Sequence, residues 1–307
     1  MPENQTQIEL LRALRNALEK DDHPMAIRCL KQIIKQARDQ DDHSGSARHF
    51  GNLALLYFRV NDVEMAIKSF NQGLKDARLA QDPLTENALL GNLGNVYREI
   101  REFKLAIEHL EAALEISKEV HDLRGRGIWL SNLGLVYDDL EQSAQAIPYH
   151  AQSIEIAREL HDQRSLASRL SHLGNSYINI GDHVTSIQHF EDCVAIYQSM
   201  GMKHEVALRI GIIGNIYAFL ARNGQDMLIN YSEALSCYVR ALDIATEIND
   251  LASQAELLNS MGAILMEMGQ THLATEHLKT AQRIFVSLNK PERIEEINVI
   301  LKYFTRS

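Results

Sequence analysis

The thirteen histidines are the first residues to consider as ligands of a metal ion. His109, His189 and His277 share one column of a repeated pattern, and His150 lies one place further along. Side chains in the same column of stacked helices lie about 10 Å apart, whereas a metal ion needs its ligands at roughly 2 Å. We therefore expect these histidines on a polar convex face and predict no metal site.

The cysteines indicate neither a disulfide or zinc site nor a reactive thiol. Cys29, Cys193 and Cys237 are too few and too scattered for a disulfide framework or a zinc site. Cys193 falls in a column of small residues, which predicts a core position, and no residue beside the three would lower a thiol pKa. Free thiols fit a reducing compartment, so we expect a cytoplasmic protein.

Motifs for catalysis or cofactor binding do not occur. The sequence has no Walker-type glycine loop, no dinucleotide fingerprint after a strand and no His-Glu-x-x-His motif. His121-Asp122 and His161-Asp162 recur with the repeat, which predicts capping residues in turns. The sequence therefore predicts a protein that is not an enzyme and has no cofactor.

The charge balance narrows the class of partner. The formal net charge is -10 at pH 7, and such a chain repels nucleic acid and anionic membranes. No stretch reaches the roughly 18 apolar residues that a membrane span needs. The N-terminal MPENQTQIEL lacks the basic and apolar regions of a secretory signal. We expect a protein or peptide partner, no nucleic acid and no membrane span.

An internal repeat must position these residues. Glycines in near-identical contexts stand 40 residues apart at Gly94, Gly134, Gly174 and Gly214, and the next, Gly262, follows after 48. Small residues recur twelve places after these glycines, except after Gly214, where the extra residues delay the small residue to Ala234, and tyrosines recur three places after the first four glycines. Apolar residues in each repeat follow the 3.6-residue period of two helices. An aspartate suited to an N-cap or a turn precedes the repeats, at Asp42, Asp82, Asp122, Asp162 and Asp250.

This pattern resembles the tetratricopeptide repeat family. In the third repeat the matching residues are Leu90, Leu93-Gly94, Tyr97, Ala106, Leu110 and Ala113. The 40-residue period and the string Asn92-Leu93-Gly94-Asn95 resemble the subclass with Leu-Gly-Asn repeats. The resemblance implies an all-α fold: a right-handed superhelical solenoid of seven helix hairpins with a C-terminal capping helix.

The repeat count predicts a single solenoid over residues 1–307. Its repeats are expected at approximately 7–46, 47–86, 87–126, 127–166, 167–206, 207–254 and 255–290, and the capping helix at 291–304. Repeat six carries an insertion, residues 221–231, in which Met227, Leu228 and Ile229 are apolar. These three residues either fold back onto the edge of the groove or contact a partner.

The first helices of tetratricopeptide repeats line a concave groove whose variable positions select the ligand. Carried over to this sequence, the resemblance implies a ligand site made of Arg48, Asn52, Arg59, Asn92, Asn95, Arg98, Asn132, Asp138, Asp139, Asn175, Asn179, Asn215 and Phe219. The same positions are occupied by Arg12, Arg15, His172, Leu208, Ile212, Ala218, Met266 and Glu267.

The asparagines suit recognition of a peptide backbone. A carboxamide can donate to one main-chain group and accept from another, so Asn95, Asn175 and Asn215 could bind an extended segment with little demand on its sequence. The alternative is that asparagines such as Asn92 and Asn132 cap or bridge neighbouring helices.

The arginines and the apolar residues indicate different parts of a ligand. Guanidinium groups pair well with carboxylates, which favours an acidic segment at the N-terminal half, unless the arginines pair with nearby acids such as Glu99. Phe219, Leu208 and Ile212 suggest an apolar anchor site at the other end. Contact with the insertion is the rival explanation for these three.

The sequence favours an interaction scaffold or adaptor that binds a peptide segment of a partner protein in its groove. Two alternatives remain: a peptide-sensing regulatory receptor, and a scaffold that self-assembles as a homo-oligomer. Regulation of a separately encoded enzyme is a further possibility that sequence does not test.

Overall fold

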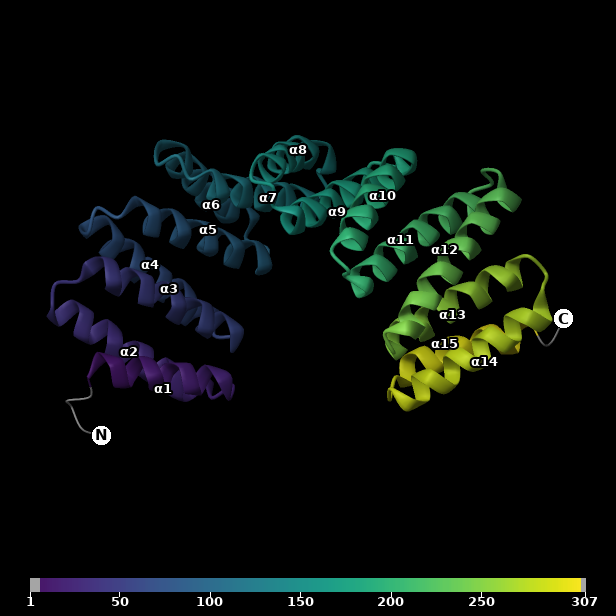
Figure 1. Ribbon diagram of the computed structural model, residues 1–307, viewed down its shortest axis with the longest axis horizontal. Helices are drawn as coiled ribbons and strands as arrows, with labels where there is room; N and C mark the ends of the chain where they lie inside the picture. Colours follow the sequence, from purple (N-terminus) through teal and green to yellow (C-terminus); the bar gives the residue numbers. More distant parts are fainter. Residues whose placement is uncertain (1–5, 305–307) are drawn as a thin grey trace. The chain divides into compact units, whose positions relative to one another are not determined.

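The structure is a computed structural model that describes residues 6–304 of the chain. Fifteen α-helices and no strands form this described part (Figure 1). The predicted all-α class is therefore confirmed. The helices divide into two compact units, Met1–His161 and Asp162–Ser307. The expectation of one continuous solenoid stays a prediction.

The first unit contains four helix hairpins. Within a hairpin the two helices pack closely, and the second helix packs on the first helix of the next hairpin. The helices are α1 (Gln7–Glu19), α2 (His23–Asp39), α3 (His43–Arg59), α4 (Val63–Leu79), α5 (Pro83–Glu99), α6 (Phe103–Glu119), α7 (Leu123–Asp139) and α8 (Ser143–Glu159).

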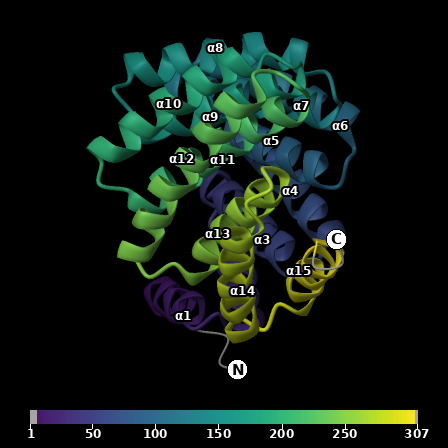
Figure 2. The same cartoon turned by 90° about the vertical axis from the view of Figure 1, so that its right-hand side faces the viewer.

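The second unit contains three hairpins and a final single helix. Its helices are α9 (Gln163–Asn179), α10 (His183–Ser199), α11 (Lys203–Arg222), α12 (Met227–Glu247), α13 (Leu251–Glu267), α14 (Thr271–Ser287) and α15 (Pro291–Phe304). Figure 2 shows α13, α14 and α15 side by side, and α15 contacts both of the others. The buried Ile297 belongs to this packing, so α15 forms the predicted capping helix.

Three-residue turns set the repeat length. At the end of α2, the N–H groups of Asp41 and Asp42 donate to the carbonyls of Arg38 and Ala37, which closes the helix with a left-handed residue. The carboxylate of the same Asp42 accepts from the N–H of Gly45 at 2.8 Å and caps α3. One residue thus ends one helix and begins the next. Helices of 17 residues separated by such turns give the 40-residue period.

The turns correct two details of the sequence interpretation. Asp122 and Asp162 are N-caps as predicted, but His121 and His161 occupy the left-handed turn position, with φ of 55° and 52°. In the middle of the chain each hairpin also begins four residues before the predicted repeat, as at His43 rather than residue 47. The capping aspartate marks the start, whereas the prediction counted from the glycine.

The glycine column allows close packing between the helices of a hairpin. A Cβ atom on Gly94 would lie 2.7 Å from Cγ of Leu110, and one on Gly134 would lie 2.4 Å from the ring of His150. The small residues Ala66 and Ala106 in the second helices are fully buried. The small residues therefore let the two helices of a hairpin approach each other closely.

The expectation of a convex histidine face is wrong. His150 is fully buried, in a column that holds Leu110, Phe190 and Leu278 in other repeats. The rings of His109 and His189 lie 5.1 and 5.3 Å from those of Tyr97 and Tyr177 in the same hairpins. These histidines pack inward because the second helix turns this side toward the first.

Candidate functional site

A cavity of about 290 Å³ lies between α1 and α3 in the first unit. We call it the α1–α3 cavity. Two predicted ligand residues, Asn52 and Arg59, line it, and both are exposed. They lie seven residues apart and therefore share one face of α3. The rest of the lining is apolar: Leu14, Leu18, Leu30, Leu55 and Leu56.

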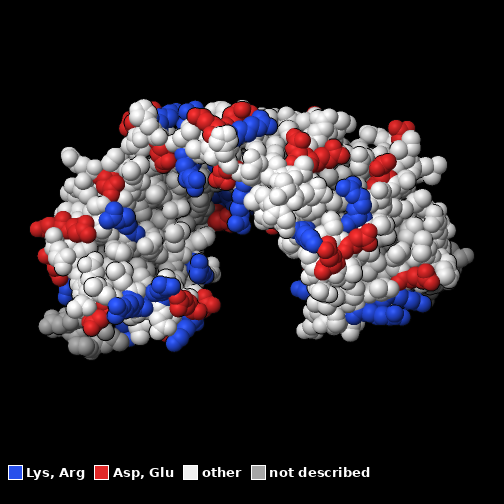
Figure 3. Space-filling model, in the orientation of Figure 1, with Lys and Arg blue, Asp and Glu red and all other residues white. Residues whose placement is uncertain are grey.

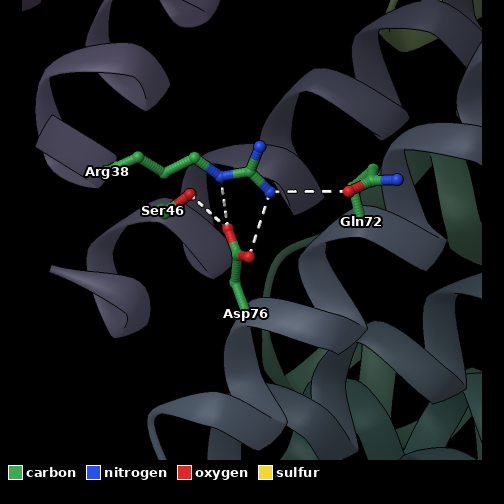
Figure 4. Close-up of polar contacts among 4 residues, drawn as sticks. All are labelled: Arg38, Ser46, Gln72 and Asp76. Atoms are coloured by element: carbon green, nitrogen blue, oxygen red, sulfur yellow. Dashed lines mark hydrogen bonds and ion pairs between the residues drawn. The ribbon is translucent and has the colours of Figure 1, made fainter. Parts of the chain in front are cut away.

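A buried carboxylate fixes the helices behind this cavity. Asp76 of α4 is 3% exposed and accepts two hydrogen bonds of 3.0 Å from the guanidinium of Arg38 in α2 (Figure 4). The hydroxyl of Ser46 in α3 donates to the same carboxylate at 2.5 Å, and Gln72 accepts a longer bond from Arg38. This network joins α2, α3 and α4, and α3 carries Asn52 and Arg59.

The predicted Arg98 and Asp139 are brought together across neighbouring hairpins. Nε of Arg98 lies 3.2 Å from a carboxylate oxygen of Asp139, and Nη2 lies 2.6 Å from one of Glu99. Burial raises the pKa of Asp139 and outweighs the opposing effect of Arg98. The alternative in which arginines pair with nearby acids is thus realised for Arg98.

The predicted ligand asparagines of α5 and α7 are half-buried. Asn92, Asn95 and Asn132 all belong to this group. The carboxamide oxygen of Asn95 is buried and has no hydrogen-bond partner among the described residues. An acceptor without a donor suits a ligand N–H, because an unpaired buried acceptor is costly.

Asp138 belongs to the interior of its hairpin. One carboxylate oxygen lies 2.9 Å from Nε2 of the buried His150. The prediction placed Asp138 on the ligand surface, but the structure uses this oxygen to partner a histidine. The sequence signal was available, since His150 stands in a column that is otherwise apolar or aromatic.

A second cavity of about 290 Å³ lies on α11, α12 and α13 of the second unit. We call it the α11–α13 cavity. Predicted residues Leu208, Ile212 and Asn215 line it together with Glu256 and Tyr238. The hydroxyl of Tyr238 donates to the carboxamide oxygen of Asn215 at 2.6 Å. Burial raises the pKa of Tyr238 to about 12, so the phenol keeps its proton.

The insertion lengthens helix ends and leaves its apolar residues exposed. It gives α11 20 residues and α12 21, where most helices have 17. Met227, Leu228 and Ile229 are 51%, 69% and 63% exposed, which excludes the alternative that they fold back.

The base of the insertion is tied to α13. Glu267 accepts hydrogen bonds from Arg222 at 3.0 Å and from the hydroxyl of Tyr231 at 2.5 Å. Glu267 therefore holds the two ends of the insertion in place, although its sequence position predicted a ligand residue. Ala218 and Met266, which fall at the same kind of position, are buried.

The remaining predicted residues lie on first helices but differ in surroundings. Arg48 of α3 is exposed, as are Asn175 and Asn179 of α9. Phe219 is 50% exposed, and its ring lies 4.9 Å from that of His183. Its ring contact is thus with α10, whereas the sequence offered the insertion as the alternative to a ligand.

Several residues of these sites were missed from sequence. Asp76 stands in a column that holds isoleucine in later repeats, at Ile116, Ile156 and Ile196. An acid at such a position indicates a buried ion pair. Leu11 likewise stands where the other first helices carry glycine, serine or, in α13, asparagine, and Leu55 where three of them carry asparagine.

Two searches of residues 6–304 give negative findings. No group of three or more His, Cys, Asp or Glu side chains there could hold a metal ion. None of the described helices is long and apolar enough to cross a membrane.

Comparison with known proteins supports the tetratricopeptide repeat family. The family model of the tetratricopeptide repeat matches residues 85–159 and 128–199. The comparison with curated protein sequences gives no match.

Solved structures resemble the chain over most of its length. The apo form of RapI is 15% identical, with a TM-score of 0.64, over 92% of this chain and 99% of RapI. A Rap protein complexed with competence and sporulation factor is 15% identical, with a TM-score of 0.57, over 100% and 88%. Aspartyl phosphate phosphatase F from Bacillus subtilis is 15% identical, with a TM-score of 0.61, over 91% and 72%. At these identities the likeness establishes the fold, a tetratricopeptide-type helical-hairpin solenoid.

Proposed function

We propose that the chain is a protein-interaction scaffold that binds a peptide segment of a partner protein on the exposed faces of its first helices. The observation that carries this proposal is the pair of cavities. Each lies on first helices, α1 and α3 or α11 and α13, and each includes predicted ligand residues. Apolar walls with a few polar side chains are typical of ligand sites.

The polar side chains in these places suit a peptide. Asn52 and Arg59 face one cavity, and Asn215 faces the other. The unpartnered oxygen of Asn95 adds an acceptor on α5. Main-chain N–H groups of an extended segment need such acceptors, because they are unpaired when the segment arrives.

A regulatory receptor is the second candidate. A Rap protein of similar fold was solved in complex with competence and sporulation factor, so a solenoid of this kind can hold a signalling molecule. In that case a bound peptide would change the affinity of this chain for a second partner.

The proposed role is non-catalytic and cytoplasmic. One structural neighbour is named a phosphatase, but at 15% identity that activity does not transfer. The buried thiol of Cys193 has a raised pKa, chiefly because burial disfavours its charged form, so it is a poor nucleophile at neutral pH.

Affinity capture from native lysate with chemical cross-linking tests the proposal. Four baits are compared: wild type, Asn52→Ala/Arg59→Glu, Leu208→Glu, and Lys68→Glu as a control on the exposed side of second helix α4. All substituted residues are exposed, and circular dichroism verifies each fold. We expect a partner that is lost with at least one cavity variant, retained by the control and cross-linked to first helices.

Other outcomes would change the proposal. A partner retained by every variant would move the interaction to the insertion or to second helices. Recovery of nothing but the chain itself, together with a mass that rises with concentration, would replace the adaptor by a self-assembling scaffold.

A further inference from the structure

The α1–α3 cavity continues into an exposed apolar strip. Leu11 and Leu18 of α1 are 42% and 43% exposed, and Leu55 of α3 is 45% exposed. A further cavity of about 380 Å³ on α1 shares Leu14 and Leu18 with the α1–α3 cavity. We call Leu11, Leu14, Leu18 and Leu55 the leucine strip. The core does not require a leucine at position 11, since the other first helices have glycine, serine or asparagine there.

The strip suits a helix better than an extended segment. Leu11, Leu14 and Leu18 follow the i, i+3, i+7 spacing of one helix face and extend over about 10 Å. The backbone of α1 is already hydrogen-bonded within its helix, so it offers nothing to the main chain of an extended peptide. An incoming helix satisfies its own backbone and can place an apolar ridge between these leucines.

Cations surround the strip. Arg12, Arg48 and Arg59 are exposed, and no carboxylate among residues 6–304 forms an ion pair with them. Arg15 is paired with Glu19 at 2.9 Å. In Figure 3, Lys and Arg atoms lie where α1 and α3 end, with Asp and Glu atoms among them. Residues 7–59 hold nine Lys and Arg against seven Asp and Glu, a net charge of +2 in a chain of -10.

We propose that the leucine strip and its arginines bind an acidic amphipathic helix of a partner protein. The proposal rests on the scaffold function and names the partner for the N-terminal site. Apolar residues on one face of the partner helix fill the spaces beside Leu14 and Leu18. Carboxylates at its edges face Arg12, Arg48 and Arg59, where they gain from unpaired guanidinium groups.

A selection of random peptides gives a direct test. The probe is a phage-displayed library of peptides of about 16 residues, long enough for a helix to form on binding. The library is selected on the full chain and then tested on Leu18→Glu and Arg59→Glu, on Leu208→Glu in the α11–α13 cavity, and on the control Lys68→Glu. We expect enriched peptides with apolar residues at helical spacing and an excess of Asp and Glu.

The affinities of an enriched peptide sharpen the test. Leu18→Glu should weaken binding by about 30-fold, as for a central apolar contact. Arg59→Glu should weaken it less and reduce its salt dependence, because a rim charge acts through a screened field. Lys68→Glu should leave binding unchanged, and the bound peptide should gain a helical circular dichroism signal.

Several results would overturn the inference. Enrichment of basic peptides, or equal binding to wild type and Leu18→Glu, would exclude the acidic helix. If the peptides lose binding with Leu208→Glu alone, the scaffold function stands but its binding site is the α11–α13 cavity. A concentration-dependent dimer abolished by Leu18→Glu would show that a second copy covers the strip. No enrichment on any bait would contradict the scaffold function as well.

Discussion

The α1–α3 cavity and the α11–α13 cavity are built on equivalent helices but present different chemistry. The α1–α3 cavity has leucine walls beside unpaired arginines, and the buried Asp76 pairs with the half-exposed Arg38 and joins α2 and α3, which line the cavity, to α4. The α11–α13 cavity includes Glu256, which pairs with Arg293, and Asn215, which accepts from the phenol of Tyr238. The repeat fixes where a cavity forms, while individual substitutions decide its charge.

The largest expected effect concerns the two ion pairs that brace these regions. Asp76→Ala leaves the buried Ser46 hydroxyl without its acceptor and the half-exposed Arg38 without its partner, so we expect a loss of about 2.5 kcal/mol in the free energy of unfolding. Glu267→Ala breaks the more exposed contacts with Arg222 and Tyr231 and should cost about 1 kcal/mol. Urea denaturation measures both. Equal losses would contradict the comparison between a buried and an exposed brace.

Two glycines in the same column differ in the space around them. A Cβ atom on Gly91 would lie 2.3 Å from the ring of Trp129, whereas one on Gly211 would lie 3.6 Å from Leu257. We expect Gly91→Ala to cost about 2 kcal/mol through overpacking. Gly211→Ala should instead gain about 0.5 kcal/mol, because alanine favours the helix. Thermal unfolding of the two variants checks the opposite signs, and a loss in both would refute the difference in packing.

The left-handed turn positions should respond in opposite directions. Glu141 has φ of 61° in the first unit, and Gly269 has φ of 75° in the second. Glu141→Gly relieves the strain of a Cβ atom and should raise the free energy of unfolding by about 1 kcal/mol. Gly269→Ala should lower it by a similar amount, although nothing lies within 4 Å of the new methyl group. Denaturation midpoints of the two variants measure these changes. Shifts of the same sign would show that turn strain does not decide the stability of both variants.

The smallest effect is the pH response of two capping aspartates. Burial raises the pKa of Asp82, but hydrogen bonds from Ser44 and Thr85 outweigh it and lower the pKa below its ordinary value. The Ser253 hydroxyl chiefly lowers the pKa of Asp250, and His204, in the same column as Ser44, adds to this. A folded pKa below the unfolded one gives stability that is present above the unfolded pKa and lost as pH falls through the folded pKa.

Matched variants separate the two caps. Ser44→Ala and His204→Ala each remove one partner, so each aspartate pKa should move back toward its ordinary value. The loss of thermal stability between neutral pH and about pH 2 should then become smaller than in wild type. Melting curves across this range provide the measurement. If the loss of thermal stability at low pH is the same in both variants as in wild type, these hydrogen bonds do not stabilise the charged form of the capping aspartates.

The periodicity of the sequence predicted most of the helices. Helix class, the capping aspartates and the final helix follow from local signals: 3.6-residue apolar spacing, a side chain that satisfies orphan N–H groups, and a proline suited to a first turn. The left-handed turns were harder to predict, because residues such as Glu141 and His121 occupy them instead of glycine.

The ligand-site prediction was less complete, because exposure depends on neighbours in space. Asn52, Arg59 and Asn215 line cavities as their positions suggested. Arg98 and Asp138 have partners inside the protein, contributed by Asp139 of the next hairpin and His150 of the same one.

The sequence by itself therefore determined the repeat, its helices and the faces that the first helices present, because these depend on residues a few places apart. The tertiary structure alone decided which polar side chains remain available. Asp76 meets Arg38 across 38 residues and Glu267 meets Arg222 across 45. Whether a charge is paired depends on such distant contacts, which the spacing of residues along the chain does not specify.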